Sequence, residues 1–167
     1  IGGPLGSAAI NQAVRESLPA LLADFQIVHI CGKDKIDNLL LNTNGYRQFE
    51  YLKTELKDVF AMADVVVSRA GANAICELLA LKKPNLLIPL SAGASRGDQI
   101  LNARSFEAQG FSMVLDEDYL SPGLLTEKVQ ELYFTRQTYI AAMSRSQQTT
   151  AISTLISLFE DIVSGRC

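Results

Sequence analysis

The chain has 167 residues, of which 48% are hydrophobic and 20% are charged, and its formal net charge is −3. These values are typical of one folded domain and exclude an intrinsically disordered chain. Basic residues form no cluster larger than pairs such as Lys82-Lys83, so nucleic acid is not expected as the main partner, because binding to a phosphate backbone requires a concentrated basic surface.

No apolar run reaches the ~18–20 residues that a membrane span needs, so no transmembrane segment is expected. The three cysteines, Cys31, Cys76 and Cys167, form no CxxC pair. Free thiols in a reducing, cytoplasmic compartment are therefore expected.

Predicted helices and strands alternate along the chain. Helices are predicted from apolar residues at helical spacing, and strands from short β-branched runs bounded by Gly, Pro or polar turns. The predicted elements are, in chain order, a helix over 8–22, a strand over 25–32, a weaker helix over 35–41, a strand over 46–52, a helix over 55–63, a strand over 64–68, a helix over 73–81, a strand over 85–90, a helix over 98–110, a strand over 111–115, and helices from about 121 to 163.

The predicted strands are continuously apolar, which is typical of a parallel sheet covered on both faces. We therefore expect one α/β domain over residues 1–167, Rossmann-like and three-layered. Gly2-Gly3 should follow a first strand, of which only Ile1 belongs to this sequence. Ligands of such sheets bind where the carboxyl ends of strands lead into helices.

Three segments rich in Gly, Ala or Ser fall at predicted strand-to-helix junctions: 2–7, 69–77 and 91–102. Small residues let backbone N–H groups approach a ligand, and the helix start behind each loop favours an anion. Together they indicate a phosphate-bearing ligand. None matches the P-loop pattern or GxGxxG, so neither an ATPase nor a plain dinucleotide-binding domain is indicated.

Several polar residues near these loops also have structural interpretations. Glu77 could complement the helix dipole, Asp98 could cap its helix, and Asn102 could be a polar residue on a helix face. Arg69 could be half of a buried ion pair. For His29, the only histidine, a structural role is favoured over a catalytic one. The sequence shows no Ser/His/Asp arrangement and no His/Cys/Asp/Glu spacing typical of a metal site.

Five segments match motifs of one family in register: "GGPLGSAAIN" (2–11), His29 with Gly32, "ADVVVSRAGANAICE" (63–77), "KPNLLIPL" (83–90) and "DQILNA" (98–103). On these motifs the chain resembles, over nearly its whole length, the C-terminal, donor-binding domain of MurG-type glycosyltransferases. The resemblance implies the C-terminal half of a two-domain GT-B fold, with a UDP-sugar held mainly in this half.

The resemblance also implies roles for particular residues. Glu77 would bind the ribose hydroxyls, and Gln99 with Asp98 would contact GlcNAc, with Asn102 supporting that loop. The remaining implied contacts are through the main chain: Gly71, Ala72, Asn73 and Ala74 for the diphosphate and sugar, Leu52 and Lys53 for uracil, and Leu5 and Gly6 for a phosphate. Pro4 stands where the family usually has a serine whose hydroxyl touches a phosphate.

The activity that the resemblance implies is an inverting, metal-independent transfer of GlcNAc from UDP-GlcNAc to a lipid-linked peptidoglycan precursor, without a cofactor. The catalytic base and the acceptor site would belong to an N-terminal domain absent from this chain, so no catalytic residue is assigned here and the chain alone is not expected to turn over. The whole enzyme would lie on the inner face of the bacterial plasma membrane. The alternatives are a transferase with another lipid acceptor (a diacylglycerol glycosyltransferase or an Alg13-like split subunit) and a UDP-sugar-binding module without activity.

Overall fold

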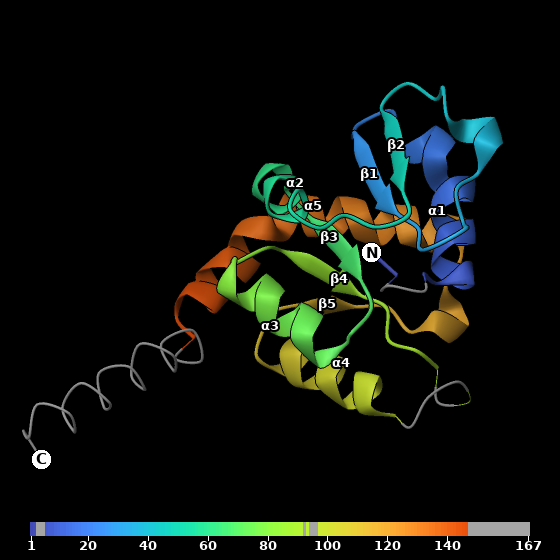
Figure 1. Cartoon of the computed structure of the whole chain (residues 1–167). Coiled ribbons are helices and arrows are strands. Elements are labelled where there is room, and N and C mark those ends of the chain that lie inside the picture. Colours follow the sequence, from blue (N-terminus) through green and yellow to red (C-terminus); the bar gives the residue numbers. More distant parts are fainter. Residues whose placement is uncertain (3–5, 92, 94–96, 147–167) are drawn as a thin grey trace, which may run out of the picture.

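The computed structural model describes residues 1–2, 6–91, 93 and 97–146. Within them helices and strands alternate as predicted (Figure 1). The elements are α1 (Ala8–Leu21), β1 (Ile27–Ile30), the 3-10 helix η1 (Asn38–Leu40), β2 (Tyr46–Phe49), α2 (Leu56–Met62), β3 (Val66–Ser68), α3 (Ala72–Ala80), β4 (Asn85–Leu87), α4 (Asp98–Ala108), β5 (Met113–Val114), the 3-10 helix η2 (Glu117–Tyr119) and α5 (Pro122–Ser144).

The described strands form two parallel sheets. In one, β1 pairs with β2, with Ile27 opposite Tyr46. In the other the order is β3-β4-β5, with Val66 opposite Asn85 and Leu86 opposite Met113. Parallel pairing is thus confirmed, but the described strands form two sheets instead of the expected single sheet. Figure 1 shows the N-terminus lying between them.

Residues of β4 alternate between two hydrophobic cores. Leu86 packs in a cluster with residues of α1 and α5, whereas the next residue, Leu87, packs in a second cluster with residues of α3 and α4. Successive side chains of a strand point to opposite faces, so helices cover the three-stranded sheet on both sides. The three-layer arrangement predicted from continuously apolar strands is therefore confirmed.

Local sequence signals place the helix starts. Ser7 caps α1, where its Oγ accepts from the N–H of Ile10 at 3.3 Å, and Ser121 caps α5 by accepting from the N–H of Leu124. Pro122 stands at the first position of α5, where its missing N–H costs no helical hydrogen bond.

Several expected elements are shorter in the structure than predicted. The strands expected over 25–32, 85–90 and 111–115 are Ile27–Ile30, Asn85–Leu87 and Met113–Val114. The helix expected over 35–41 is a single 3-10 turn, Asn38–Leu40, and the strand expected over 46–52 ends at Phe49. The helical prediction from about 121 to 163 is confirmed over Pro122–Ser144. Arg145 and Ser146 are not helical, and the residues after them lie outside the described residues. None of the helices in the described ranges has the length and apolar character needed to cross a bilayer.

Candidate functional site

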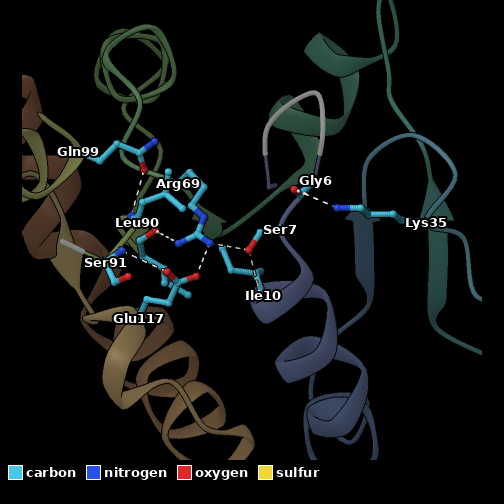
Figure 2. A network of polar contacts seen from close by, with 10 residues as sticks. Gly6, Ser7, Ile10, Lys35, Arg69, Leu90, Ser91, Gln99 and Glu117 are labelled. Carbon is cyan, nitrogen blue, oxygen red and sulfur yellow. Dashed lines mark hydrogen bonds and ion pairs between the residues drawn. The ribbon is translucent and has the colours of Figure 1, made fainter. Parts of the chain in front are cut away.

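A buried arginine joins two of the three predicted small-residue loops (Figure 2). Arg69 directly follows β3 and is only 8% exposed. One of its guanidinium nitrogens donates to the Oγ of Ser7 at 2.6 Å, and the other donates to the carbonyl of Ile88 at 3.1 Å. Since Ser7 also caps α1, Arg69 fixes the start of that helix against the carboxyl ends of β3 and β4.

Glu117 extends this network to the third loop. Its carboxylate forms a buried ion pair with Arg69 and accepts from the N–H of Ser91 at 3.2 Å (Figure 2). The interpretation of Arg69 as half of an ion pair is thereby confirmed. The sequence did not identify Glu117 as the partner of Arg69, because the two residues lie 48 positions apart. The signal that could have indicated this residue is its position just after a predicted strand. We call Ser7, Arg69, Ser91 and Glu117 the loop clamp.

Two side chains of α4 bind the same loops. The Oε1 of Gln99 accepts from the N–H of Leu90 at 3.2 Å, and the Nδ2 of Asn102 donates to the carbonyl of Ala70 at 3.0 Å. Asn102 is half-buried. It connects α4 to the junction between β3 and α3.

The start of α3 presents backbone donors. Gly71 is its N-cap in an extended conformation and provides no side-chain cap. As at the start of any α-helix, the first amides, those of Ala72, Asn73 and Ala74, have no intrahelical partner. The side chain of Glu77 is exposed and lies in the second turn. A dipole effect is confined to the first turn, so the dipole interpretation of Glu77 is wrong.

Asp98 does not cap α4. The N-cap is Gly97, which has φ +84°, and Asp98 is the first residue of the helix itself, with an exposed side chain. The capping interpretation is therefore wrong by one residue. An acid at this position instead complements the positive end of the helix dipole.

The first glycine loop packs tightly against β1. Gly6 has φ +65°, and a Cβ built on it would lie 1.9 Å from the carbonyl oxygen of Cys31. The Nζ of Lys35 donates to the carbonyl of Gly6 at 3.3 Å (Figure 2). Only glycine fits here, so the loop approaches β1 more closely than any side chain would permit. The predicted phosphate contact of Leu5, and Pro4 beside it, lie outside the described residues.

Leu52 and Lys53 follow β2, on the other sheet. Leu52 is half-buried, and Lys53 is exposed with its Nζ 5.9 Å from the ring centroid of Tyr51. Within the described ranges no hydrogen bond joins either residue to the loop clamp. The structure thus brings the three loops together but does not connect the predicted uracil-reading segment to them.

His29 has the predicted structural role. Its Nε2 lies 2.9 Å from the Oδ1 of Asn11, which can only accept, so its Nδ1 accepts from the hydroxyl of Tyr46 at 2.7 Å. Burial is the main cause that lowers the pKa of His29, to about 3, and the charge of Arg15 acts in the same direction. A neutral histidine therefore links α1 to β1 and β2.

No three His, Cys, Asp or Glu side chains in the described part of the chain are grouped so that they could hold a metal ion.

Comparison with known proteins places the chain among glycosyltransferases. The model of the glycosyltransferase family 28 C-terminal domain matches residues 1–158. The chain is 55% identical over 161 residues to the UDP-N-acetylglucosamine–N-acetylmuramyl-(pentapeptide) pyrophosphoryl-undecaprenol N-acetylglucosamine transferase of Lachnospira eligens, covering 96% of this chain and 46% of the relative. The protein of the same name from Geobacillus thermodenitrificans is 53% identical over 161 residues, with 96% and 45% covered. The chain thus spans about half the length of these relatives.

Solved structures share the fold at lower identity. The crystal structure of MurG from Acinetobacter baumannii superposes with a TM-score of 0.75 at 21% identity, over 94% of this chain and 48% of that one. A kitacinnamycin glycosyltransferase gives a TM-score of 0.70 at 23% identity, over 90% and 39%. These likenesses confirm the expected fold class, one α/β half of a GT-B glycosyltransferase.

Proposed function

The chain belongs to the glycosyltransferase family 28 C-terminal domain family, and on this premise we propose that it is the UDP-GlcNAc-binding half of an N-acetylglucosaminyltransferase that makes the lipid-linked precursor of peptidoglycan. The names of its relatives describe that transfer, from UDP-N-acetylglucosamine to a pyrophosphoryl-undecaprenol acceptor. The chain matches less than half of each relative, and we assign the acceptor site and the catalytic base to the half outside it.

The observation that carries this proposal is the loop clamp. Arg69 and Glu117 hold the loops that precede α1 and α4 against the end of β3, where α3 also begins. Three helix starts therefore converge where the strands end, the position at which open α/β sheets bind ligands. Each helix start contributes partial positive charge from its unpaired amides. Such an arrangement suits the diphosphate of a nucleotide sugar.

Glu77 suits the ribose. Its exposed side chain lies on the second turn of α3, beyond the amides of Ala72, Asn73 and Ala74. A diphosphate bound to these amides would bring the attached ribose toward α3, where a carboxylate accepts hydrogen bonds from both ribose hydroxyls. We assign uracil recognition to the main chain at Leu52 and Lys53.

We assign the contacts with the sugar to α4. Gln99 and Asp98 would bind the GlcNAc hydroxyls. Asn102 would act through the carbonyl of Ala70, to which it donates, and would thus hold the start of α3 in place. The amides of Leu5 and Gly6 would meet a phosphate.

The transfer we propose is a single displacement with inversion. The acceptor hydroxyl attacks C1 of GlcNAc, the bond from C1 to the diphosphate oxygen breaks, and a base in the other half takes the hydroxyl proton. Charge then develops on the departing UDP, and the helix starts stabilise it without a metal ion or other cofactor. Without the base and the acceptor site, the chain alone would bind the donor but not turn over.

We place the whole enzyme at the cytoplasmic face of the bacterial plasma membrane. Its donor is a water-soluble nucleotide sugar, whereas its acceptor carries a lipid anchor. A peripheral enzyme reaches both.

Calorimetric titration with UDP and UDP-GlcNAc tests donor binding. Glu77→Gln keeps the size of the side chain but removes its charge, and should weaken UDP binding by about 1.5–3 kcal/mol, the scale of hydrogen bonds to a charged group. The matched control is Glu127→Gln, an exposed acid in α5, which should leave affinity unchanged. No detectable heat for the unsubstituted chain at millimolar UDP would reject the donor site, and equal affinities for the two variants would reject the role of Glu77.

Turnover requires a separate assay. The longer protein is mixed with UDP-GlcNAc and lipid I, and the lipid product is measured. UDP binding without transfer to lipid I would favour a different acceptor or a binding module.

A further inference from the structure

A lysine approaches the first glycine loop from the side opposite to Arg69. The Nζ of Lys35 donates to the carbonyl of Gly6 at 3.3 Å, and Gly6 directly precedes Ser7, the N-cap of α1. Figure 2 shows the side chains of Arg69 and Lys35 reaching the start of α1 from opposite sides. Two cations therefore lie beside one helix start, where unpaired backbone amides already favour an anion.

The backbone around Lys35 is held on two sides. The N–H of Lys35 donates to the carbonyl of Gly32 at 3.3 Å, and the carbonyl of Lys35 accepts from a guanidinium nitrogen of Arg15 in α1. The N–H of Gly32 donates to the carbonyl of Glu50 at 3.0 Å, and that of Asp34 donates to the Oε1 of Glu50 at 3.1 Å. This turn thus connects α1 to the segment after β2. A ligand that binds to Lys35 needs to order little more than its side chain, which keeps the entropic cost low.

In the described part of the chain, Lys35 and Arg15 have no counterion. No carboxylate there lies within 4.0 Å of a side-chain nitrogen of either residue. Arg15 donates to two neutral acceptors, the carbonyl of Lys35 and the Oε1 of Gln48, and its Nε is buried without a hydrogen-bond partner. Arg69, by contrast, pairs with Glu117. The chain therefore neutralises the cation on one side of the start of α1 and leaves the other side positive.

A groove beside α1 gives a ligand access to this positive side. It has a volume of about 470 Å³ and is lined by Arg15 and Lys35 together with the α1 residues Ala8, Asn11, Gln12 and Glu16. Glu16 is the one acid among these lining residues, and its exposed carboxylate accepts from Gln12 at 2.9 Å. Two cations against one anion leave the lining positive, and the groove reaches Ala8, the first residue of α1.

We propose that Lys35 is a further diphosphate-binding residue of the donor site. Its ammonium carries three N–H groups, of which one donates to Gly6. Another would donate to a phosphate oxygen of the nucleotide sugar at the starts of α1 and α3. This inference rests on the proposed function, because the donor supplies the ligand.

The bond from Lys35 would be charge-assisted. Such bonds are shorter and stronger than bonds between neutral groups. Negative charge grows on the diphosphate as UDP departs, so the ammonium of Lys35 would also stabilise the leaving group. Arg15 would act only through the backbone of Lys35, whose carbonyl it holds.

Calorimetric titration of the longer protein with UDP and, at high concentration, with uridine tests this role. Lys35→Met keeps an unbranched side chain but removes the charge. It should weaken UDP binding by about tenfold or more, the scale of a hydrogen bond to a charged group, and should leave uridine binding unchanged, because uridine has no phosphate. Lys33→Met is the matched control, since Lys33 is an exposed lysine of the same turn. It should change UDP affinity by less than about twofold.

Two further readouts separate phosphate binding from a structural role at Gly6. Lys35→Arg restores the charge and should recover most of the lost UDP affinity. Raising the salt concentration from about 0.05 M to about 0.5 M should weaken UDP binding more steeply in the unsubstituted protein than in Lys35→Met, because salt screens the charge that the variant lacks. A lysine that served only to hold the carbonyl of Gly6 would leave these two salt dependences equal, and equal dependences would overturn the proposal.

The remaining outcomes are also decisive. Thermal unfolding without ligand checks that Lys35→Met folds, and Lys35→Gln replaces it in every measurement if it does not. Equal UDP affinities of Lys35→Met and Lys33→Met would overturn the proposal, as would equal losses of UDP and uridine affinity in Lys35→Met. So would unchanged UDP affinity with a raised KM for lipid I, which would assign Lys35 to the acceptor. Absence of UDP binding in the unsubstituted protein would reject the proposed function itself, whereas UDP binding that does not depend on Lys35 would reject this inference alone.

Discussion

Truncation of Glu117 tests whether the loop clamp stabilises the fold. Glu117→Ala removes the carboxylate that pairs with Arg69 and accepts from the N–H of Ser91. Arg69 would keep its bonds to Ser7 and Ile88, but its charge would remain buried without a counterion. The neighbouring acid offers a matched control, because Asp116 pairs with Arg104 at the surface.

Burial sets the expected magnitudes. The side chains of Arg69 and Glu117 are 10% and 15% exposed, whereas those of Arg104 and Asp116 are 48% and 36% exposed. Removing one partner of a buried pair costs about 3–5 kcal/mol, and the two remaining bonds of Arg69 favour the lower end. We expect Glu117→Ala to lower the free energy of unfolding by about 3 kcal/mol, and Asp116→Ala by less than about 1 kcal/mol, as for an exposed pair.

Urea unfolding at pH 7, followed by far-UV circular dichroism because the chain has no tryptophan, measures both values. Glu117→Gln keeps the shape but not the charge, and its loss should fall between those of the two alanine variants. If Glu117→Ala and Asp116→Ala cost the same, or if high salt abolishes the effect of Glu117→Ala, the loop clamp is not a buried electrostatic contact and the reasoning fails.

Three further changes have defined outcomes. Gly6→Ala should lower Tm strongly or prevent folding, because its Cβ would overlap a backbone carbonyl, whereas Gly123→Ala, with no atom within 4 Å of its Cβ, should leave Tm unchanged or raised. Asn102→Ala should cost about 1–3 kcal/mol in urea unfolding, since it leaves the buried carbonyl of Ala70 unpaired, and a loss below 0.5 kcal/mol (about the scale of a neutral surface change) would contradict this. The pKa of His29 is lowered from 6.5 to about 3, so the unfolded state binds the extra proton between these values. The stability from neutral His29 is complete above pH 6.5 and falls by about 1.4 kcal/mol per pH unit below it, and His29→Gln should remove this slope from urea unfolding measured between pH 4 and 7.

Prediction from sequence succeeded where the determining neighbours are close in the chain. The helix over 8–22 was predicted from the spacing of its apolar residues, and the structure places it at Ala8–Leu21. The helix over 35–41 was the weakest prediction, and it is a single 3-10 turn. For Asp98 the error was one residue, because the left-handed Gly97 takes the cap position.

The candidate site was predictable as a set of loops but not as a set of contacts. The three small-residue junctions were identified from composition and from the rule that parallel strands end at one edge. The partner of Arg69 could not be identified, because any acid on a neighbouring strand end would have satisfied the same pattern. The roles of Glu77 and the other assigned donor residues stay predictions until ligand binding is measured.

Local chemistry in the sequence therefore established the element order, the parallel character of the strands and the motifs of the family. These depend on periodicity and on neighbours within a few positions. Packing of distant segments established that Glu117 neutralises Arg69 across 48 residues, that Asn102 holds the start of α3, and that the Nζ of Lys35 reaches the carbonyl of Gly6. Such contacts depend on how whole elements are placed in space, and the spacing of residues along a chain does not specify that placement.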